Sequence, residues 1–290
     1  MPTIEQAIQF NPDASFVPGN LVPSFLPGLK VQLFHGFEWK KKGHFRIRGC
    51  FDLYCTQGPF FTKKFEELRA QHPHFTVKET GWTKLDNLFK ANHADASTNK
   101  KPIILYAPTF SPSLTSTDAL FEQIVALSKK HDWQWKVKFH PKMDSATVEK
   151  YQAAQHDKLE VVASSSILPL LQESNVMISD TSSAITEFLL MGKPVVTFNN
   201  AQPEPVLINI DNADALESSL EKALAMDVEL EHAINVYSSD MHPYTDGESA
   251  KRVLAATIDE IEHFPRPENC PKPKNWFRNL KLRKRMGYWR

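Results

Sequence analysis

The feature that most constrains the fold of this chain is a regular alternation of short β-rich runs and helical patterns from about residue 100 onward. The run Ile103-Ile104-Leu105-Tyr106 is apolar on both sides, whereas Leu120, Ile124 and Leu127 form one apolar helical stripe. Such alternation predicts a parallel sheet with helices on both faces. We expect strands at 102–107, 134–139, 159–163, 175–179 and 194–198, and helices at 118–130, 145–155, 167–173 and 183–191.

The first 95 residues are less regular and predict a smaller α/β lobe, with strands near 14–17, 30–34, 51–56 and 75–79. Residues 91–101 are polar and suit a linker, and 246–264 has a helical apolar stripe. Prolines then interrupt regular structure before a basic tail. We therefore expect three parts: an N-terminal lobe at 1–95, a larger lobe at 96–264, and a Pro-rich and basic aromatic tail at 265–290.

The composition indicates a globular protein, because 41% of the 290 residues are hydrophobic. Three cysteines without metal-ligand spacing favour a reducing compartment and incidental thiols. No apolar run reaches the roughly 20 residues that cross a bilayer, and no secretory signal precedes the first lobe. We expect a cytoplasmic protein.

The formal charge is zero overall, yet residues 272–290 carry eight Lys or Arg and no Asp or Glu. The cations alternate with Trp276, Phe277 and Leu280, a composition typical of a segment that lies on an anionic membrane surface. We expect a peripheral position on the inner face of the cell membrane and no nucleic-acid partner. RNA contact and packing back onto the first lobe are the alternatives.

Three predicted strands of the larger lobe end in polar residues, at 107–109, 138–141 and 179–183. Ligands of open parallel sheets bind beyond these carboxyl ends. The last of the three is the most informative, because an apolar strand stops at Asp180 and two serines, Ser182 and Ser183, where a helix begins. Unpaired N–H groups at a helix start favour phosphate. The structural alternative is that Asp180 or Ser182 only caps the helix.

Two histidines and two lysines are further candidates. His35 ends a predicted strand next to Gly36, where it suits a general base, although a structural histidine is the commoner case. Lys138 and His140 should point to one side of their strand and can neutralise a diphosphate. Lys84 can reach a phosphate or remain a surface lysine. The run 40–42 of three lysines lines an anionic site or is simply solvated.

No Gly-rich nucleotide fingerprint and no metal-ligand cluster occurs in the sequence. Taken in order, however, the motifs of the chain resemble the CDP-glycerol glycerophosphotransferase family, the teichoic-acid-type polymerases and primases. The resemblance covers about residues 12–260. Its motifs are Leu33-Phe34-His35-Gly36, Thr80-Gly81-Trp82-Thr83-Lys84-Leu85-Asp86, Tyr106-Ala107-Pro108-Thr109, Lys138-Phe139-His140-Pro141, Ser179-Asp180-Thr181-Ser182-Ser183 and Tyr244-Thr245-Asp246-Gly247-Glu248-Ser249-Ala250-Lys251-Arg252-Val253.

The resemblance implies a GT-B architecture of two Rossmann-like lobes and transfer of glycerol phosphate from CDP-glycerol to a hydroxyl of a lipid-linked or polysaccharide acceptor, with release of CMP. We expect no cofactor and assign no residue to a metal, and the sequence leaves metal dependence open. By motif, His35 is the base and His140 lies at the diphosphate. The implied donor-binding residues are Gly36, Lys84, Pro108, Thr109, Lys138, Asp180, Ser182, Ser183 and Glu187.

The chain departs from the family pattern in the residues after Gly36 and in Lys84, which replaces an arginine and loses its bidentate fork. Only 34 residues precede His35, so we expect a short or truncated N-terminal lobe. Two other functions stay open: a GT-B glycosyltransferase that uses a nucleotide sugar, and an inactive binding module of a surface-polysaccharide pathway.

Overall fold

The computed structural model describes residues 3–37, 43–90, 101–164, 166–263 and 270–289. The chain forms two compact units, each built on a parallel sheet. Unit 1 combines Met1–Lys90 with Ser239–Arg290, and unit 2 is Ala91–Ser238. The expected α/β class is confirmed. The three-lysine run 40–42 and nearly all of the expected linker lie outside the described residues.

Unit 2 has a six-stranded sheet in the order β10-β9-β8-β5-β6-β7, in which every neighbouring pair is parallel. Five of its strands lie close to the expected positions, and the strand at 208–210 was not predicted. Both faces of the central strands are buried, as their apolar sequences indicate. Its strands are β5 (Ile103–Tyr106), β6 (Gln134–Val137), β7 (Leu159–Val161), β8 (Val176–Ser179), β9 (Val195–Phe198) and β10 (Ile208–Ile210).

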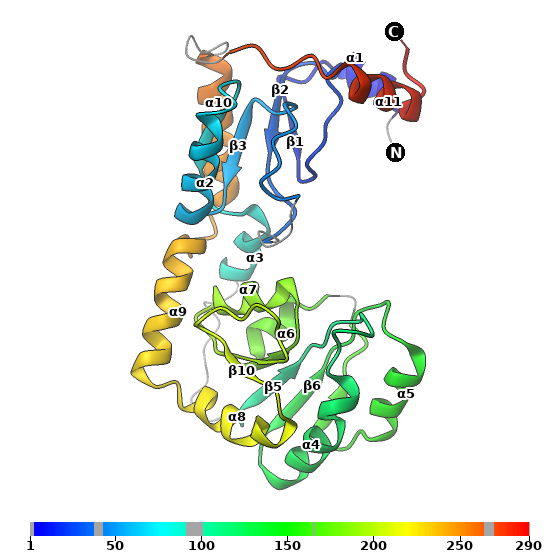
Figure 1. Ribbon diagram of the computed structural model, residues 1–290, viewed down its shortest axis with the longest axis vertical. Coiled ribbons are helices and arrows are strands. Elements are labelled where there is room, and N and C mark those ends of the chain that lie inside the picture. The colour runs from blue at the N-terminus through cyan, green and yellow to red at the C-terminus, as the bar shows by residue number, and fades with distance from the viewer. Residues whose placement is uncertain (1–2, 38–42, 91–100, 165, 264–269, 290) are drawn as a thin grey trace. The chain divides into compact units, whose positions relative to one another are not determined.

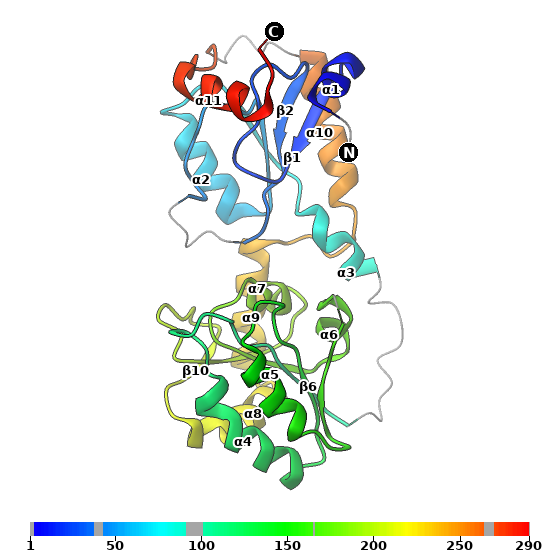
Figure 2. The same cartoon turned by 90° about the vertical axis from the view of Figure 1, so that its right-hand side faces the viewer.

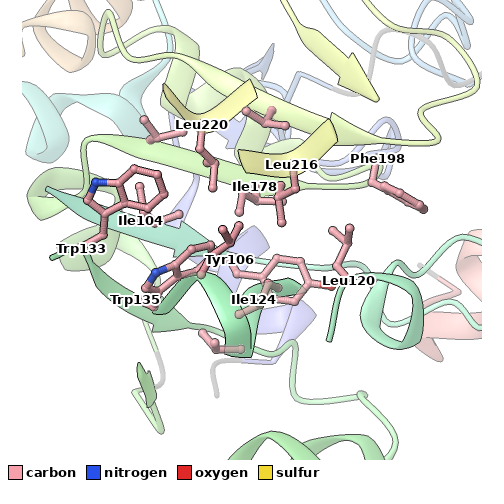
Figure 3. Close-up of a cluster of buried hydrophobic side chains, with 14 of the residues drawn as sticks. Ile104, Tyr106, Leu120, Ile124, Trp133, Trp135, Ile178, Phe198, Leu216 and Leu220 are labelled. Atoms are coloured by element: carbon pink, nitrogen blue, oxygen red, sulfur yellow. The ribbon is translucent and has the colours of Figure 1, made fainter. Parts of the chain in front are cut away.

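Helices cover both faces of this sheet. Helices α4 and α8 share a continuous apolar core with alternate strand residues, which Figure 3 shows around Tyr106 and Ile178. Helices α6 and α7 pack on β5, β8 and β9 from the other face (Figure 2). The helices are α4 (Thr117–Lys130), α5 (Ser145–Ala153), α6 (Leu168–Glu173), α7 (Ser183–Leu189), η3 (Ala213–Ala215), α8 (Leu216–Ala225) and α9 (Val228–Met241), the last of which passes from unit 2 into unit 1.

Unit 1 has a four-stranded parallel sheet in the order β1-β2-β3-β4. Figure 1 shows that its ribbon combines blue and cyan elements from the start of the chain with orange and red elements from the end. The strands are β1 (Ala14–Val17), β2 (Leu29–Gln32), β3 (Leu53–Thr56) and β4 (Thr76–Glu79), and the helices are α1 (Ile4–Phe10), α2 (Pro59–Arg69), η1 (Thr83–Leu85), α3 (Asp86–Lys90), α10 (Ser249–His263) and α11 (Trp276–Met286).

The expected boundaries need a correction, because α10 and the tail belong to unit 1 rather than to the larger lobe or to a separate segment. Helix α10 covers one face of the unit 1 sheet, where Val253 packs with Val31 and Leu53. Helix α2 covers the other face through Phe65. An apolar stripe shows that a helix covers a sheet but not which sheet, so the pattern of 246–264 could not assign it.

The tail also packs on unit 1. Lys272 Nζ lies 2.7 Å from Asp52 Oδ1, and Asn275 Nδ2 donates to the carbonyl of Arg48 over 3.1 Å. Arg283 stacks over the ring of Phe25, 4.7 Å from its centroid. These residues of the tail therefore pack on the first lobe, as one of the alternatives predicted.

Candidate functional site

The carboxyl ends of β8, β5 and β6 form one edge of the unit 2 sheet, because these strands are neighbours and parallel. The three polar strand ends that the sequence singles out follow these three strands. The sheet topology therefore gathers Pro108 and Thr109, Lys138 and His140, and the turn from Asp180 to Ser183 at one edge.

Hydrogen bonds fasten the first and third of these loops to each other. The backbone N–H of Thr109 donates to Asp180 Oδ2 over 2.9 Å, and Ser179 Oγ donates to the carbonyl of Ala107 over 2.7 Å. Asp180 is only 1% exposed, and this burial raises the pKa of its carboxyl group. Pro108, between the two contacts, is buried. Asp180 thus holds the β5 loop against β8.

His140 lies exposed beyond β6 with one ring nitrogen already used. Its ring stacks on Phe110, with the centroids 4.5 Å apart, and its Nδ1 accepts from the backbone N–H of Lys142 over 3.1 Å. A neutral His140 therefore carries its proton on Nε2, which can donate to an anionic oxygen. Lys138 is half-buried, and its Nζ donates to the carbonyl of Phe139 over 3.2 Å.

The turn into α7 contains a helix cap. Ser182 is the N-cap residue, and its Oγ accepts from the backbone N–H of Ala184 over 3.2 Å. The capping hydrogen bond of the structural alternative is therefore made by Ser182, whereas Asp180 bonds the β5 loop instead. Ser183 is exposed at the first helical position, and Glu187, one turn onward, is 3% exposed.

His35, Gly36 and Lys84 lie in unit 1. His35 is exposed just beyond β2, between a buried Phe34 and a buried Gly36. Phe34 has a φ of 62°, which is unusual for a residue other than glycine, and its carbonyl accepts from Trp82 Nε1 over 3.2 Å. Because strained backbone persists only where its surroundings fix it, these contacts hold the chain at His35 in one conformation.

The other two unit 1 candidates flank this loop. The carbonyl of Gly36 accepts from Gln57 Nε2 over 3.3 Å. Lys84 is exposed in η1, and its Nζ lies 5.0 Å from the centroid of the Trp82 ring. Trp82 therefore contacts both the His35 loop and the Lys84 side chain.

Two of the sequence motifs, 80–86 and 244–253, pack against each other within unit 1. The Asp86 carboxylate accepts from the backbone N–H groups of Ser249 and Ala250 over 2.9 and 2.8 Å, at the start of α10. Gly81 has a φ of 80°, and a Cβ there would lie 2.5 Å from Ser249 Oγ. Only glycine fits this position. The two motifs thus form one joint between the early and late parts of unit 1.

Sequence reasoning missed His242, which lies in the same joint. His242 is 2% exposed, and its Nε2 accepts from the backbone N–H of Trp82 over 2.9 Å. Burial lowers its pKa to about 4, and the charge of Arg252 acts in the same direction. The ring is therefore a neutral acceptor. His242 lies just before the motif that begins at Tyr244, and nothing in the sequence around it indicates a buried hydrogen-bond acceptor.

Among the described residues, one group of possible metal ligands, His131, Glu217 and Glu221, has its ligand atoms within 4.8 Å of one another. Glu217 is already engaged there, because its Oε2 accepts from Lys130 Nζ over 2.9 Å and its Oε1 contacts His131. None of these residues belongs to the candidate site.

Two parallel α/β sheets in one chain, one of them with polar loops at adjacent strand ends, define an α/β protein of the GT-B type. The chain belongs to the family described as CDP-glycerol:poly(glycerophosphate) glycerophosphotransferase, whose model matches residues 46–258. The resemblance found in the sequence is thereby confirmed, and the chain is a transferase of this family. His35 and Gly36 precede the matched range.

Solved structures share the fold at low identity. A protein provisionally assigned as a UDP-N-acetylglucosamine 2-epimerase from Listeria monocytogenes gives a TM-score of 0.65 at 20% identity, over 92% of this chain and 79% of that chain. The wall teichoic acid polymerase TagF gives 0.57 at 13%, over 83% and 71%. The S. aureus MnaA–UDP structure gives 0.59 at 17%, over 90% and 78%. No curated protein matches the chain.

Among the residues that the structure describes, no helix is both long enough and apolar enough to pass through a bilayer.

Proposed function

We propose that this chain transfers glycerol phosphate from CDP-glycerol to a hydroxyl of a lipid-linked or polysaccharide acceptor and releases CMP. The family match supports a transferase that uses CDP-glycerol. The observation that carries the proposal is the single edge of the unit 2 sheet at which the Thr109–Asp180 bond, the stacked His140 and the Ser182 turn lie together.

In this proposal the acceptor oxygen attacks the glycerol-bearing phosphorus, and His35 takes the hydroxyl proton. The bond from that phosphorus to the bridging oxygen breaks, and CMP leaves with this oxygen.

The charge of the linked phosphates is balanced by His140 Nε2–H, Lys138 and the turn at Ser182 and Ser183, with Lys84 as a further cation. Pro108, Thr109, Gly36 and Glu187 position the donor. Positioning and charge supply most of the catalysis in phosphoryl transfer, so we expect no cofactor.

The test is release of CMP from CDP-glycerol in the presence of an acceptor. His35→Ala should lower the rate about 10²–10⁴-fold, as expected for loss of a general base, and His140→Ala about 10²-fold. Matched controls are His263→Ala in unit 1 and His232→Ala in unit 2, which replace exposed histidines and should leave the rate unchanged. Turnover by the wild type with undiminished His35→Ala and His140→Ala variants contradicts the assigned roles.

The same fold also occurs in the Listeria monocytogenes protein that is provisionally assigned as a UDP-N-acetylglucosamine 2-epimerase. Donor screening separates the two activities: release of UDP from a nucleotide sugar favours a glycosyltransferase, and release of CMP favours the proposed transfer. Binding of CDP-glycerol without any turnover favours an inactive binding module.

We further propose that the tail attaches the protein to the inner, anionic face of the cell membrane. One face of α11 packs on unit 1 through the buried Leu282, and the other face exposes apolar side chains: Trp276 is 73%, Phe277 85% and Leu280 55% exposed. Lys281, Lys284 and Arg285 are exposed on the same helix. Aromatic groups beside cations favour the interface of an anionic bilayer.

Co-sedimentation of the full chain with phosphatidylglycerol vesicles tests this second proposal. The double variant Trp276→Ser/Phe277→Ser should lower the vesicle-binding constant about tenfold, because two apolar anchors are lost while the packed face of α11 is kept. The control is Val228→Ser, at a residue that is 80% exposed in α9. Equal binding by the double variant and the wild type excludes the tail as the attachment site.

A further inference from the structure

Phe110 is an aromatic residue at the polar edge of the unit 2 sheet to which the proposed reaction assigns no role. It directly follows Thr109 in the loop after β5, it is 37% exposed, and it is not part of the apolar core that α4 and α8 share with the sheet. Its ring contacts two residues of the loop after β6: it stacks on His140, and Lys142 Nζ lies 5.7 Å from its centroid. Phe110 thus links the loops that follow two neighbouring parallel strands.

The backbone that leads to Phe110 is fixed from the side of β8. The N–H of Thr109, the residue before it, donates to Asp180 Oδ2 over 2.9 Å, and the carbonyl of Ala107 accepts from Ser179 Oγ over 2.7 Å. Asp180 and Ser179 are 1% and 0% exposed, so both of these bonds are made inside unit 2. The aromatic ring is therefore carried by a loop that is anchored to the end of β8.

The imidazole of His140 is held by a local hydrogen bond and by this ring. Its Nδ1 accepts from the backbone N–H of Lys142, two residues onward, over 3.1 Å. That bond selects the tautomer, but a ring held at one atom alone can still tilt about the bond. The Phe110 ring contacts the imidazole with the centroids 4.5 Å apart and the planes at 27° to each other, a separation that is usual for stacked aromatic pairs. A bond in the ring plane and a contact on the ring face together define the orientation of the imidazole.

An imidazole that is ordered before the ligand arrives binds an anion more tightly than a mobile one. Immobilising a free side chain on binding costs roughly three- to tenfold in affinity, and an aromatic pair contributes a similar factor. The stack also tolerates a change of charge, because the face of a phenyl ring attracts a cation. Phe110 is therefore suited to hold His140 in both of its protonation states.

We propose that Phe110 is a positioning residue, which holds the imidazole of His140 in the orientation that binds the linked phosphates of the donor. The inference rests on the proposed transfer, in which His140 Nε2–H contacts these phosphates. It also couples His140 to Asp180, because the buried carboxylate anchors the loop that carries Phe110. Phe110 touches no reacting atom in this assignment, so its loss should act through His140 alone.

The first experiment detects the stack and does not depend on turnover. In histidine side-chain NMR spectra of the full chain, the His140 signals are those that disappear in His140→Ala. The ring current of Phe110 should shift these signals upfield in the wild type. Phe110→Leu should move them downfield, and the conservative variant Phe110→Tyr should keep them in place. The control is Leu114→Ala, at a residue that is 49% exposed in the same loop, and it should leave them unchanged. His140 signals that Phe110→Leu does not move overturn the inference.

The second experiment measures CMP release. Phe110→Leu should lower kcat/KM for CDP-glycerol about three- to tenfold, whereas Phe110→Tyr and the control Leu114→Ala should match the wild type. The Tm of Phe110→Leu should stay close to that of the wild type, because Phe110 is partly exposed and lies outside the core around Tyr106. Equal kcat/KM in Phe110→Leu and the wild type overturns the inference.

A double variant separates positioning from a merely structural role. When Phe110→Leu is added to His140→Ala, kcat/KM should fall no further, because the group that Phe110 positions is already gone. A structural role would lower kcat/KM by the same factor in both backgrounds. Equal factors therefore overturn the inference.

Failure of the proposed transfer would give a different pattern of results. If CDP-glycerol is neither bound nor turned over, the proposed transfer fails, while the NMR comparison still decides whether Phe110 orients His140. If the wild type releases CMP and His140→Ala is slow but Phe110→Leu is not, the proposed transfer stands and the role of Phe110 is excluded.

Discussion

The two units use the same α/β architecture but assemble it from different parts of the chain. Unit 2 is one continuous stretch in which strands and helices follow each other around one apolar core. Unit 1 takes its four strands from the first 80 residues and the helix that covers one face of them from 249–263. The bond from Thr76 Oγ1 to Glu260 Oε1 joins residues 184 positions apart. The comparison shows that unit 1 depends on contacts between segments separated by the whole of unit 2, whereas the contacts of unit 2 lie within one continuous stretch.

The joints between the early and late segments of unit 1 contain charged groups beside the apolar contacts of α10. Asp52 accepts from the backbone N–H of Lys30 and pairs with Lys272, and Asp86 binds the start of α10. Since ionisable groups link the early and late segments, we expect the stability of unit 1 to depend on pH and on single polar residues more than that of unit 2.

The largest effect should follow from ending the chain after Met241. Without α10, the face of the unit 1 sheet that carries Val31, Leu53 and Cys55 is uncovered. Because domains are stable by only about 5–15 kcal/mol, we expect unit 1 to lose cooperative folding while unit 2 keeps its own. Hydrogen exchange should show rapid exchange in β1–β4 and protection in β5–β10. Protected β1–β4 amides in the shortened chain would remove the contrast between the units.

A smaller effect on the stability of unit 1 should come from protonation of His242 at low pH. The pKa of the His242 ring is about 4 in the folded protein, whereas the ordinary value in an unfolded chain is 6.5. Between these values the unfolded state binds a proton that the folded state does not, so stability is full above pH 6.5 and decreases as the pH falls toward 4. The loss amounts to roughly 3 kcal/mol at most.

Urea denaturation of unit 1 between pH 7 and pH 4 measures this dependence. In His242→Gln the free energy of unfolding should depend less on pH than in the wild type. The exposed control His263→Gln should keep the pH dependence of the wild type. If His242→Gln and the wild type show the same pH dependence of the free energy of unfolding, this dependence comes from other groups.

The smallest expected effects on stability concern the starts of two helices, α10 in unit 1 and α5 in unit 2. Asp86→Ala removes the carboxylate that binds Ser249 and Ala250 at the start of α10, and Asp144→Ala removes the N-cap of α5, whose Oδ2 accepts from Thr147 N over 3.2 Å. Each should cost about 1 kcal/mol, the first in unit 1 and the second in unit 2. Differential exchange in the two sheets measures both. Destabilisation of unit 2 by Asp86→Ala is the contrary result.

Much of unit 2 could be predicted from the sequence because its signals are local. Runs that are apolar on both faces identify buried parallel strands such as β5 and β8, and these lie close to their expected positions. The positions of the polar strand ends followed from the same pattern. The bond between Thr109 and Asp180 did not, because it depends on which strands become neighbours.

Unit 1 was harder to predict because its contacts join distant segments. Nothing in the helical pattern of α10 or in the basic tail specifies the sheet that each one covers. A pocket beyond the ends of β1 and β2 shows the same limit, because Asn20, Gln32 and Tyr54, which line it together with His35, lie in separate segments and form no motif. Sequence patterns report the environment of a side chain, whereas pairing of segments is a property of the whole chain.

The placement of α10 has a consequence for the order in which the protein matures on the ribosome. Synthesis delivers the strands of unit 1 first, but the helix that covers them is among the last segments to emerge. Residues 101–238 are synthesised in between, so the sheet of unit 2 can fold before α10 is available to pack on the sheet of unit 1. The part that is translated first is thus the part that is finished last.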